Sequence, residues 1–531
     1  MRVHYLWFGA LIILAINVVA STFSTGEYLV QFGGFRFPAQ NPYKPILLLN
    51  GAFIVYFLLS KQGTDTNVEE RGRLAVPFIL LLACLVGFVY SPAIAVNFSH
   101  QDWTHRHMGA RLNSWSAVWR LFVDPQPDGM YRPLAFLSFA LDYQLFGPTL
   151  WGYHLQSIGL HVLNSILAGM LAIRLGLGVW TGRVAALLFG VSACHFEAVL
   201  WPAARFDLLA TAFGAISLLL FMKHWETIGE RSWWFGGLGL LSYGIAVLNK
   251  ETAYSIVLIV PLLIAFLKLG GDQRRRAASI IPALLGCTVA LVAVRFAVLG
   301  GIGGYAGNVV SFKSFYSMVV NSLALSVFGI NTTLESSLAK WIVVLYAGLI
   351  ILWAMAYRKL RSSAIPTLAL LAIVSAVPAI SVIGWINPSL QHTRNLYWPS
   401  IWMAMFLALV LEGTSRRTFI AAVFVAIQIS ALSFNIWVYQ DLLGAVDKSV
   451  AVVRGGVGPA TEVILIGVPA APNGVFYFGS ELEERVRREI PQIAVRTCAG
   501  IQFCEGKMEQ NEARFQWDSK SRLLKLMTGI P

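Results

Sequence analysis

The sequence predicts a polytopic α-helical membrane protein. Of its 531 residues 57% are hydrophobic and only 13% are charged, and the chain is rich in Trp, Phe and Tyr. Soluble globular proteins rarely have this composition. The net charge of +13 sits in short basic clusters between long apolar runs. That distribution is typical of membrane topology signals, so nucleic acid is not expected as a partner.

About thirteen apolar runs approach the twenty residues that a bilayer core requires. They begin near Tyr5, Pro45, Ala75, Leu150, Arg183, Leu208, Trp233, Ala253, Ala278, Trp341, Ala364, Pro399 and Phe419. A shorter run at residues 315–328 reads as an interfacial or re-entrant helix. The first run also resembles a signal peptide, but an uncleaved span fits the alternation of the loops better.

Lys and Arg gather in every second loop. The basic loops are residues 61–73, 174–183, 223–231, 268–276, 357–361 and 412–417. The positive-inside rule then places the N-terminus in the cytoplasm and the chain after Gln440 outside. We therefore expect a transmembrane domain over residues 1–440, with a long external loop at 92–148 that carries interfacial helices.

Residues 441–531 read as a small external αβ tail. Two short apolar runs, 462–469 and 475–478, predict buried strands. The charged segment 480–489 predicts a helix with Ser480 at its N-cap. Cys498 and Cys504 share this tail and are able to pair in an oxidising compartment. No catalytic constellation is evident in the tail.

Ionisable residues form islands between the apolar runs, all on the predicted outer face. Residues of this kind at membrane depth are costly, so a functional site is their default interpretation. The islands contain Asp102, Tyr131, Arg132, His195, Glu197, Arg205, Asp207, Lys250, Glu251, His392, Arg394 and Tyr397.

This set of side chains indicates glycosyl transfer from a lipid-phosphate sugar. A carboxylate accepts the proton of an attacking hydroxyl. Arg205, Lys250 and Arg394 are the candidates for holding the donor phosphate, where negative charge builds up. Trp and Tyr side chains suit the flat face of a sugar. We expect the other eight residues apart from Asp102 to support the site or to bind substrate.

Several ordered motifs between residues 95 and 410 resemble the GT-C class of membrane glycosyltransferases. They are most similar to the protein O-mannosyltransferase-like branch whose eukaryotic members carry tetratricopeptide repeats. The motifs are Asp102, Tyr131-Arg132-Pro133-Leu134, Leu145-Phe146-Gly147, Gly152-Tyr153-His154, Leu160-His161-Val162-Leu163-Asn164, His195-Phe196-Glu197-Ala198-Val199-Leu200-Trp201 with Arg205 and Asp207, Lys250-Glu251, and Arg394-Asn395-Leu396-Tyr397-Trp398-Pro399-Ser400.

The resemblance implies a polyprenyl- or dolichyl-phosphate sugar as donor and inversion at the anomeric carbon. It also implies a catalytic acid in the first long external loop, which assigns the general-base role to Asp102. The chain departs from the family in three respects. Gln101 stands where a second acid is usual, and no tetratricopeptide period follows the membrane domain. Two or three spans precede Asp102, where the family usually has one. The acceptor, whether protein, lipid or glycan, stays open.

Structural interpretations compete for each of these residues. The alternative for Asp102 is a solvated acid in a loop. The alternative for His195 and Glu197 is a hydrogen bond to one another that closes a helix end. Arg205 and Asp207 are two apart and do not share a helix face, so each favours a more distant partner. Lys250-Glu251 also fits a helix anchor at the interface.

Two groups of histidines also have structural alternatives to a functional role. His154 and His161 lie on one helical face and read as packing residues. His100, His105 and His107 beside Asp102 have ligand-like types, but no four-ligand spacing is fixed, so neither a metal nor another cofactor is predicted. A transporter or flippase of a lipid-linked sugar is the rival function. Membrane lipid is an expected partner, and a bacterial inner membrane, with a periplasmic tail, is the expected location.

Overall fold

The computed structural model describes most of the chain after residue 72. The described residues are 29–32, 35–38, 73–95, 100–126, 129–301, 303, 329, 364–379, 390, 392–414, 416–469, 478–498, 512–519 and 521–527. The spans expected from Tyr5, Pro45 and Trp341, and the short run at 315–328, lie outside these residues.

The protein is a polytopic helical membrane protein. Five of the described helices are long and apolar enough to cross a bilayer, namely Val76–Ile94, Leu150–Arg174, Pro202–Glu226, Gly271–Leu299 and Arg417–Gly456. A sixth candidate is broken, because Val179–Gly190 and Ala193–Leu200 meet at a bend of 43°. Shorter apolar helices fill the spaces between them, at Glu251–Phe266, Ala364–Ala379 and Ser400–Glu412.

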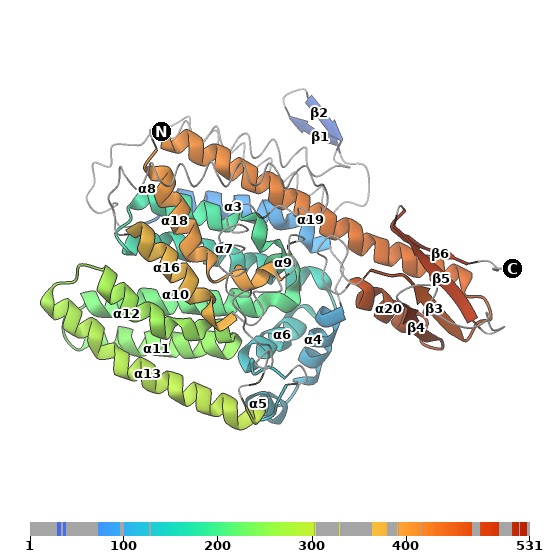
Figure 1. The fold of residues 1–531 in the computed structure, drawn as a ribbon, viewed down its shortest axis with the longest axis horizontal. Helices are drawn as coiled ribbons and strands as arrows, with labels where there is room; N and C mark the ends of the chain where they lie inside the picture. Colours follow the sequence, from blue (N-terminus) through green and yellow to red (C-terminus); the bar gives the residue numbers. More distant parts are fainter. Residues whose placement is uncertain are drawn as a thin grey trace.

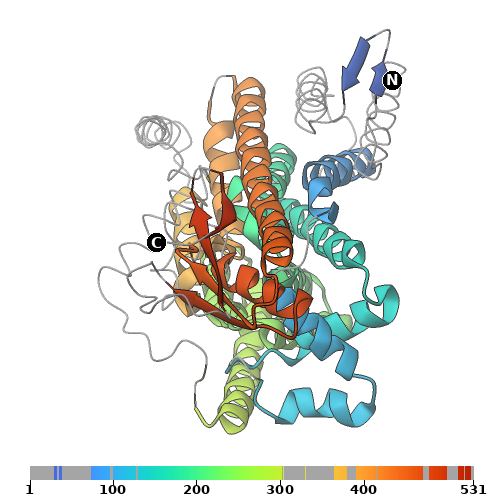
Figure 2. The same ribbon diagram turned by 90° about the vertical axis from the view of Figure 1, so that its right-hand side faces the viewer.

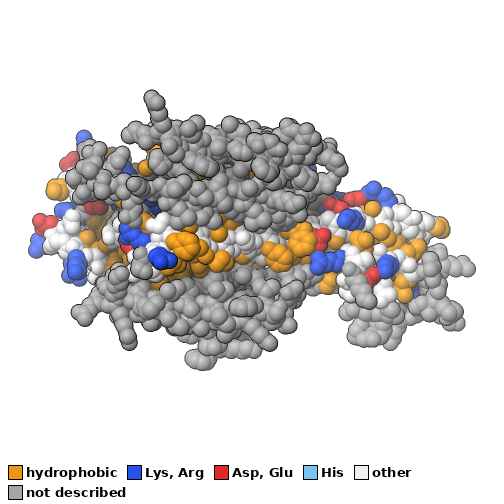
Figure 3. Space-filling view, turned by 90° about the horizontal axis from the view of Figure 1, so that it is seen from above, with side chains coloured by type: hydrophobic (Ala, Val, Ile, Leu, Met, Phe, Trp, Pro, Cys, Tyr) orange, Lys and Arg blue, Asp and Glu red, His pale blue; other side chains and the backbone are white. Residues whose placement is uncertain are grey.

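The helices run back and forth along the long axis of the molecule (Figure 1). In chain order they are α3 Val76–Tyr90, α7 Leu150–Arg174, α8 Val179–Gly190, α10 Arg205–Glu226, α11 Arg231–Asn249, α12 Ile256–Phe266, α13 Gly271–Leu299, α16 Ala364–Ala376, α18 Ser400–Glu412 and α19 Arg417–Gly456. Seen from above, apolar side chains occupy the middle of the described surface and charged ones gather toward its two ends (Figure 3).

One ion pair shows that two helices end at the same end of the bundle. Arg174, at the end of α7, contacts Glu226, at the end of α10, at 2.8 Å. The basic turns after these helices therefore gather at one end. The start of α10 and the end of α11 lie at the opposite end, where the acidic and basic islands are.

Three short helices lie within residues 92–148, the segment expected to be a loop with interfacial helices. They are α4 His100–Arg111, α5 Trp115–Val123 and α6 Pro133–Phe146. Asp102 consequently belongs to a helix, α4. Arg132 is the N-cap residue of α6, and Pro133 is its first helical residue. Proline is favoured at this position because the N–H that it lacks would have no partner within the helix.

The tail is built on α19, which continues to Gly456. The domain boundary expected at residues 440/441 therefore falls inside a helix. Leu442, Leu443 and Val446 stay buried past that point, so apolar packing sustains the helix. A four-stranded sheet follows in the order β4-β3-β5-β6, with β3 parallel to both β4 and β5 and with β5 antiparallel to β6.

The tail strands are β3 Glu462–Ile466, β4 Ala494–Cys498, β5 Glu512–Asp518 and β6 Leu523–Leu526. Helix α20, Phe478–Glu489, packs against both α19 and α4 (Figures 1 and 2). It begins two residues before Ser480, so Ser480 is not its N-cap. Residues 475–477 of the second expected strand are outside the described residues, and Phe478 is helical. Cys498 is disulfide-bonded.

A small antiparallel hairpin, β1 Leu29–Phe32 with β2 Phe35–Pro38, was not expected from the sequence. Its residues lie between the first two apolar runs.

Helices α4 and α6 approach closely at Gly109. A methyl group there would lie 2.6 Å from the Phe139 carbonyl oxygen, inside any real contact. We expect Gly109→Ala to push α4 away from α6 and to cost about 1–3 kcal/mol of stability. Thermal unfolding in detergent measures this cost. Gly87→Ala, in α3 with open space around it, is the matched control. An unchanged melting temperature in Gly109→Ala would contradict the close packing.

Candidate functional site

A break in the helical chain separates α8 from α10. Here the backbone forms the short turns η3 Ala193–His195, α9 Phe196–Leu200 and η4 Pro202–Ala204. Pro202 opens η4 and ends α9, since proline removes a helical hydrogen bond. Broken helices leave backbone N–H and C=O groups for side chains to reach. The break therefore offers polar contacts within an apolar bundle.

Asp102 of α4 is tied to this break. Its Oδ1 accepts a hydrogen bond from the Ala203 backbone N–H at 2.6 Å, and the residue is only 2% exposed. Bonds from a neutral donor to a carboxylate are strong when both groups are dry. The interpretation of Asp102 as a solvated loop acid is therefore wrong.

Glu197, in α9 of the break, forms a buried ion pair with Arg394. Arg394 Nη1 lies 2.6 Å from Glu197 Oε1. The backbone N–H groups of Arg394 and His392 also donate to the Glu197 carboxylate, at 3.0 and 3.3 Å. A bond between His195 and Glu197 is thus not what holds this turn. The Arg394 guanidinium lies 4.7 Å from the Trp201 ring centre, a cation–π contact.

Asp207 and Lys250 pair across α10 and the end of α11. Lys250 Nζ contacts Asp207 Oδ1 at 2.5 Å and donates to Asn395 Oδ1 at 3.1 Å. Lys250 is 3% exposed, so it does not anchor a helix in the water interface. The second Asp207 oxygen, Oδ2, is buried and has no hydrogen-bond partner among the described residues. A buried acceptor of this kind favours a ligand or a water.

Arg132 and Glu251 make the third pair. Arg132 Nη2 lies 2.6 Å from Glu251 Oε1, and Nε donates to Oε2 at 3.1 Å. The arrangement is bidentate, which fixes the guanidinium plane. The Phe206 ring lies near both Arg132, at 4.5 Å, and Lys250, at 5.6 Å from its centre. Two cations from distant segments therefore meet at one aromatic ring.

Arg205 is enclosed more completely than the other cations. It forms an ion pair with Asp142 of α6 and donates to the Tyr153 carbonyl at 3.0 Å. Its guanidinium also lies 4.8 Å from the Phe139 ring centre. Arg205 and Asp207 thus have separate partners, as their spacing predicts. Arg205 is fully buried and is held as a scaffold between α6, α7 and α10.

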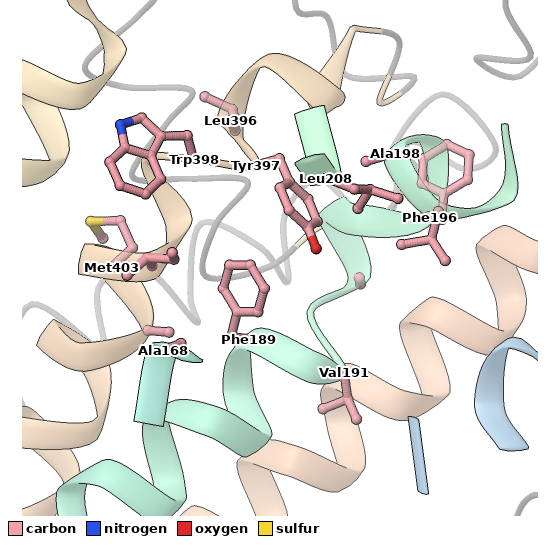
Figure 4. Close-up of a cluster of buried hydrophobic side chains, with 14 of the residues drawn as sticks. Ala168, Phe189, Val191, Phe196, Ala198, Leu208, Leu396, Tyr397, Trp398 and Met403 are labelled. Atoms are coloured by element: carbon pink, nitrogen blue, oxygen red, sulfur yellow. The ribbon is translucent and has the colours of Figure 1, made fainter. Parts of the chain in front are cut away.

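His195 and Tyr397 belong to a separate buried network. His195 Nε2 bonds the Ser400 hydroxyl at 2.7 Å, and His161 Nδ1 bonds the Tyr397 hydroxyl at 2.6 Å. Asn164 donates to the same hydroxyl at 3.2 Å. Figure 4 shows Tyr397 among Phe189, Leu208 and other apolar side chains. His161 is therefore a core histidine with its polar atoms satisfied.

A small cavity lies beside this network. It is lined by Leu188, Phe189, Ser192, His195, Ser400, Ala404, Leu407, Phe424 and Gln428. None of the ion-paired residues lines it, so we separate this cavity from the charged site. Tyr131, another predicted site residue, donates its hydroxyl to the Phe122 carbonyl at 3.0 Å and connects α5 to the site.

Two histidines near the cations are held neutral. Burial lowers the pKa of His105, and the charges of Arg132 and Arg205 lower it further, to about 3. Burial likewise lowers the pKa of His392, with Arg394 and Lys250 adding to the effect, also to about 3. Neither imidazole is an acid at neutral pH, so a proton-donating role falls to other groups. In the described part of the chain no cluster of three or more His, Cys, Asp or Glu side chains is arranged to hold a metal ion.

The structure brings most of the predicted residues together at one break in the bundle. Arg394 stacks on Trp201 and Asp102 accepts a hydrogen bond from Ala203, so segments 292 residues apart (394 minus 102) contact neighbouring positions of the break. His195 and Tyr397 lie outside this cluster. Sequence reasoning missed Asp142, although it is the one charged residue in the α6 sequence and such an isolated acid signals a partner.

The chain is similar to membrane mannosyltransferases. Residues 126–298 match the family described as dolichyl-phosphate-mannose-protein mannosyltransferase. This segment includes seven of the eight residues that form the site's four ion pairs, whereas Arg394 and Asp102 lie outside it. The resemblance to the protein O-mannosyltransferase-like branch is therefore confirmed.

The particular relatives are eukaryotic proteins. Protein O-mannosyl-transferase Tmtc2 of Drosophila melanogaster is 31% identical over 225 residues, which cover 40% of this chain and 24% of the relative. TMTC2 of Homo sapiens is 38% identical over 133 residues, or 24% of this chain and 16% of the relative. The chain thus spans about a quarter or less of these relatives' length.

The solved structures to which the chain is similar share less sequence identity with it than these relatives do. ArnT from Cupriavidus metallidurans bound to undecaprenyl phosphate has a TM-score of 0.44 and 12% identity, and the match covers 84% of this chain and 94% of ArnT. The S. cerevisiae Pmt1-Pmt2 complex bound to the sugar donor has a TM-score of 0.32 and 17% identity, covering 52% and 38% of the two chains.

The enclosure of Arg205 yields a stability prediction. Arg205→Met leaves the buried Asp142 carboxylate without its counter-ion and is expected to cost about 3–5 kcal/mol. The double variant Arg205→Met/Asp142→Leu removes both charges and is expected to recover most of that loss. Thermal unfolding of the purified variants measures both effects. Equal melting temperatures for the single and double variants would refute the scaffold role.

The neutral His105 predicts how stability depends on pH. The unfolded chain binds a proton on this histidine near pH 6.5, and the folded chain does so only near pH 3. Stability is therefore complete above pH 6.5 and falls as the pH drops toward 3. His105→Gln is expected to lose less melting temperature than wild type between pH 7 and pH 4.5. His107, exposed on the same helix, also has a lowered pKa, because partial burial and Arg106 disfavour its charged form. His107→Gln is therefore the comparison variant and is expected to give a smaller effect than His105→Gln, and parallel curves for His105→Gln and wild type would count against this assignment.

Proposed function

We propose that this chain is a GT-C-type glycosyltransferase. It transfers a monosaccharide from a polyprenyl-phosphate donor to an acceptor hydroxyl at the outer face of the membrane. The observation that carries the proposal is a convergence of charges around the helix break. The Asp102 carboxylate and Arg394 contact the break itself, and the cations Arg132 and Lys250 meet at Phe206, just after it.

Asp102 is the proposed general base. Its Oδ1 bond to Ala203 fixes the carboxylate against the break without neutralising it. Burial removes competing water, which strengthens the interaction of the carboxylate with an acceptor hydroxyl. Glu197, Asp207 and Glu251 are assigned the role of holding the cations in place, because each forms an ion pair with one of them.

The donor phosphate is assigned to Lys250 and Arg394, with Arg132 beside them. Each cation is held by a carboxylate of the protein, so the empty site is close to neutral and the charges are pre-positioned. A phosphate that approaches Lys250 competes with Asp207 for the ammonium group. Arg205 was the third candidate, but its complete enclosure by Asp142 and Tyr153 favours a positioning role.

The proposed reaction is a single displacement. The acceptor oxygen loses its proton to Asp102 and attacks the anomeric carbon. The bond from that carbon to the phosphate oxygen breaks, and the polyprenyl phosphate leaves with the electron pair. The cations stabilise the charge that builds on the phosphate, and attack from the opposite face inverts the anomeric centre. No cofactor is needed to balance the reaction.

The names of the relatives suggest the substrates. They are called protein O-mannosyl-transferases, and the matched family is described by dolichyl-phosphate-mannose. We therefore propose mannose or a related hexose as the sugar. A hydroxyl of a protein is the first acceptor to test, with lipid and glycan hydroxyls as the alternatives.

The proposed location is a bacterial inner membrane, with a cytoplasmic N-terminus and a periplasmic tail. The basic turns at one end of the bundle support this orientation through the positive-inside rule. The disulfide at Cys498 supports it as well, because disulfides persist in oxidising compartments. The site then opens to the periplasm.

Sugar transfer tests the proposal directly. Purified wild type in lipid nanodiscs is expected to move labelled mannose from polyprenyl-phosphate mannose to a peptide rich in Ser and Thr. Asp102→Asn is expected to lower the turnover by about a hundredfold or more, because it removes the base and keeps the shape. Asp124→Asn, an exposed acid at the end of α5, is the matched control and is expected to keep wild-type turnover.

Two outcomes would contradict the proposal. Full turnover in a folded Asp102→Asn protein would remove Asp102 from the mechanism. Movement of the labelled donor across sealed vesicles without any transfer would instead favour the transporter alternative.

A further inference from the structure

Helix α5 has three distinct faces. Trp115, Trp119 and Val123 are 89%, 65% and 42% exposed and follow one another at intervals of four, which places them on one side of the helix. Ser116 and Arg120 are exposed on the neighbouring side. Leu121, on the opposite side, is buried.

A helix with one apolar face, one polar face and one protein-contacting face fits a boundary between lipid and water. Trp side chains prefer that boundary, since the ring sits among lipid and the indole N–H reaches polar groups. In a soluble setting two Trp rings exposed to this degree would be costly.

The position of α5 supports the same surroundings. α13 exposes Leu285, Val289, Val292 and Phe296, spaced four, three and four apart, which is the pattern of a lipid-facing side. The chain just past α13 touches the segment that follows α5, because a methyl group at Gly303 would lie 3.2 Å from the Gly129 carbonyl.

The figures show the direction of α5. It lies beyond the end of α13 and is seen nearly end-on in Figure 1, whereas in Figure 2 it extends sideways. It therefore runs across the direction of the spanning helices, as a helix in the plane of the membrane surface does.

We propose that α5 is seated in the phospholipid headgroup region of the outer leaflet and that this seat positions Arg132 in the site. Trp115 and Trp119 insert toward the acyl chains, and Arg120 faces the headgroups. The lipid contact is independent of the enzyme's chemistry. Its effect on Arg132 rests on the proposed function.

Three hydrogen bonds connect α5 to Arg132. The Gln126 side chain donates to the Leu121 carbonyl at 3.3 Å, and its Oε1 accepts from the Arg132 backbone N–H at 2.7 Å. The Tyr131 hydroxyl donates to the Phe122 carbonyl at 3.0 Å. Displacing α5 from the membrane surface therefore shifts the backbone that carries the Arg132–Glu251 pair.

Spin labelling tests the lipid contact. A nitroxide is placed at Trp119→Cys or at Ser116→Cys in a protein whose Cys84 and Cys287 are replaced by Ala. In nanodiscs, position 119 is expected to be more accessible to oxygen than to a nickel chelate, and position 116 the reverse. Greater nickel accessibility at position 119 would overturn the membrane seat.

Turnover tests the coupling to Arg132. Trp115→Ser/Trp119→Ser is expected to raise the KM for polyprenyl-phosphate mannose at least fivefold in nanodiscs, and Trp115→Phe/Trp119→Phe is expected to restore it. Trp233→Ser/Trp234→Ser removes two other exposed rings, 59% and 75% exposed, at the start of α11 and is expected to leave the KM unchanged.

The outcomes separate the two proposals. Wild-type KM in the Ser double variant, with transfer intact, would overturn the coupling alone. No transfer by wild type would overturn the proposed function and the coupling, while the spin-label result would still decide the membrane seat.

Discussion

Buried ion pairs between helix ends are the interactions on which the site depends. Arg132–Glu251, Arg205–Asp142, Lys250–Asp207 and Arg394–Glu197 each join segments distant in the sequence. The free-energy cost of burying an unpaired charge in an apolar bundle is high, so each charged residue requires its partner. The break at residues 191–204 exists in this setting because side chains and backbone groups satisfy one another there.

These pairs also set the chemical character of the site. Such pairs add little net stability, since desolvation offsets most of the attraction. The ion pairs instead fix the orientation of the guanidinium and ammonium groups, so that these cations are in place before a negatively charged phosphate binds. A site ordered before substrate arrives does not reorganise during the reaction. Three buried polar atoms of these pairs have no hydrogen-bond partner among the described residues, namely Asp207 Oδ2, Asp142 Oδ1 and Arg205 Nε.

Much of this arrangement was predictable from the sequence, and some was not. Apolar length predicted the long helices of the described residues, because this signal is local. The spacing of Arg205 and Asp207 excluded a mutual pair. Asp142 was missed since its partner is 63 residues away, and the separate network of His195 and Tyr397 depends on rotamers that spacing does not encode. The burial of Asp102 arises from tertiary packing of α4 against the break.

The continuity of α19 has a consequence for the tail. A helix of 40 residues is about 60 Å long, and it enters the tail without a hinge. Each residue turns such a rod by about 100°. The orientation of the αβ tail relative to the bundle therefore depends on the length of α19. One residue added within residues 440–456 would rotate the tail by about 100° and separate α20 from α4. Seven added residues would nearly restore the orientation, because they complete about two turns, but would move the tail further from the bundle.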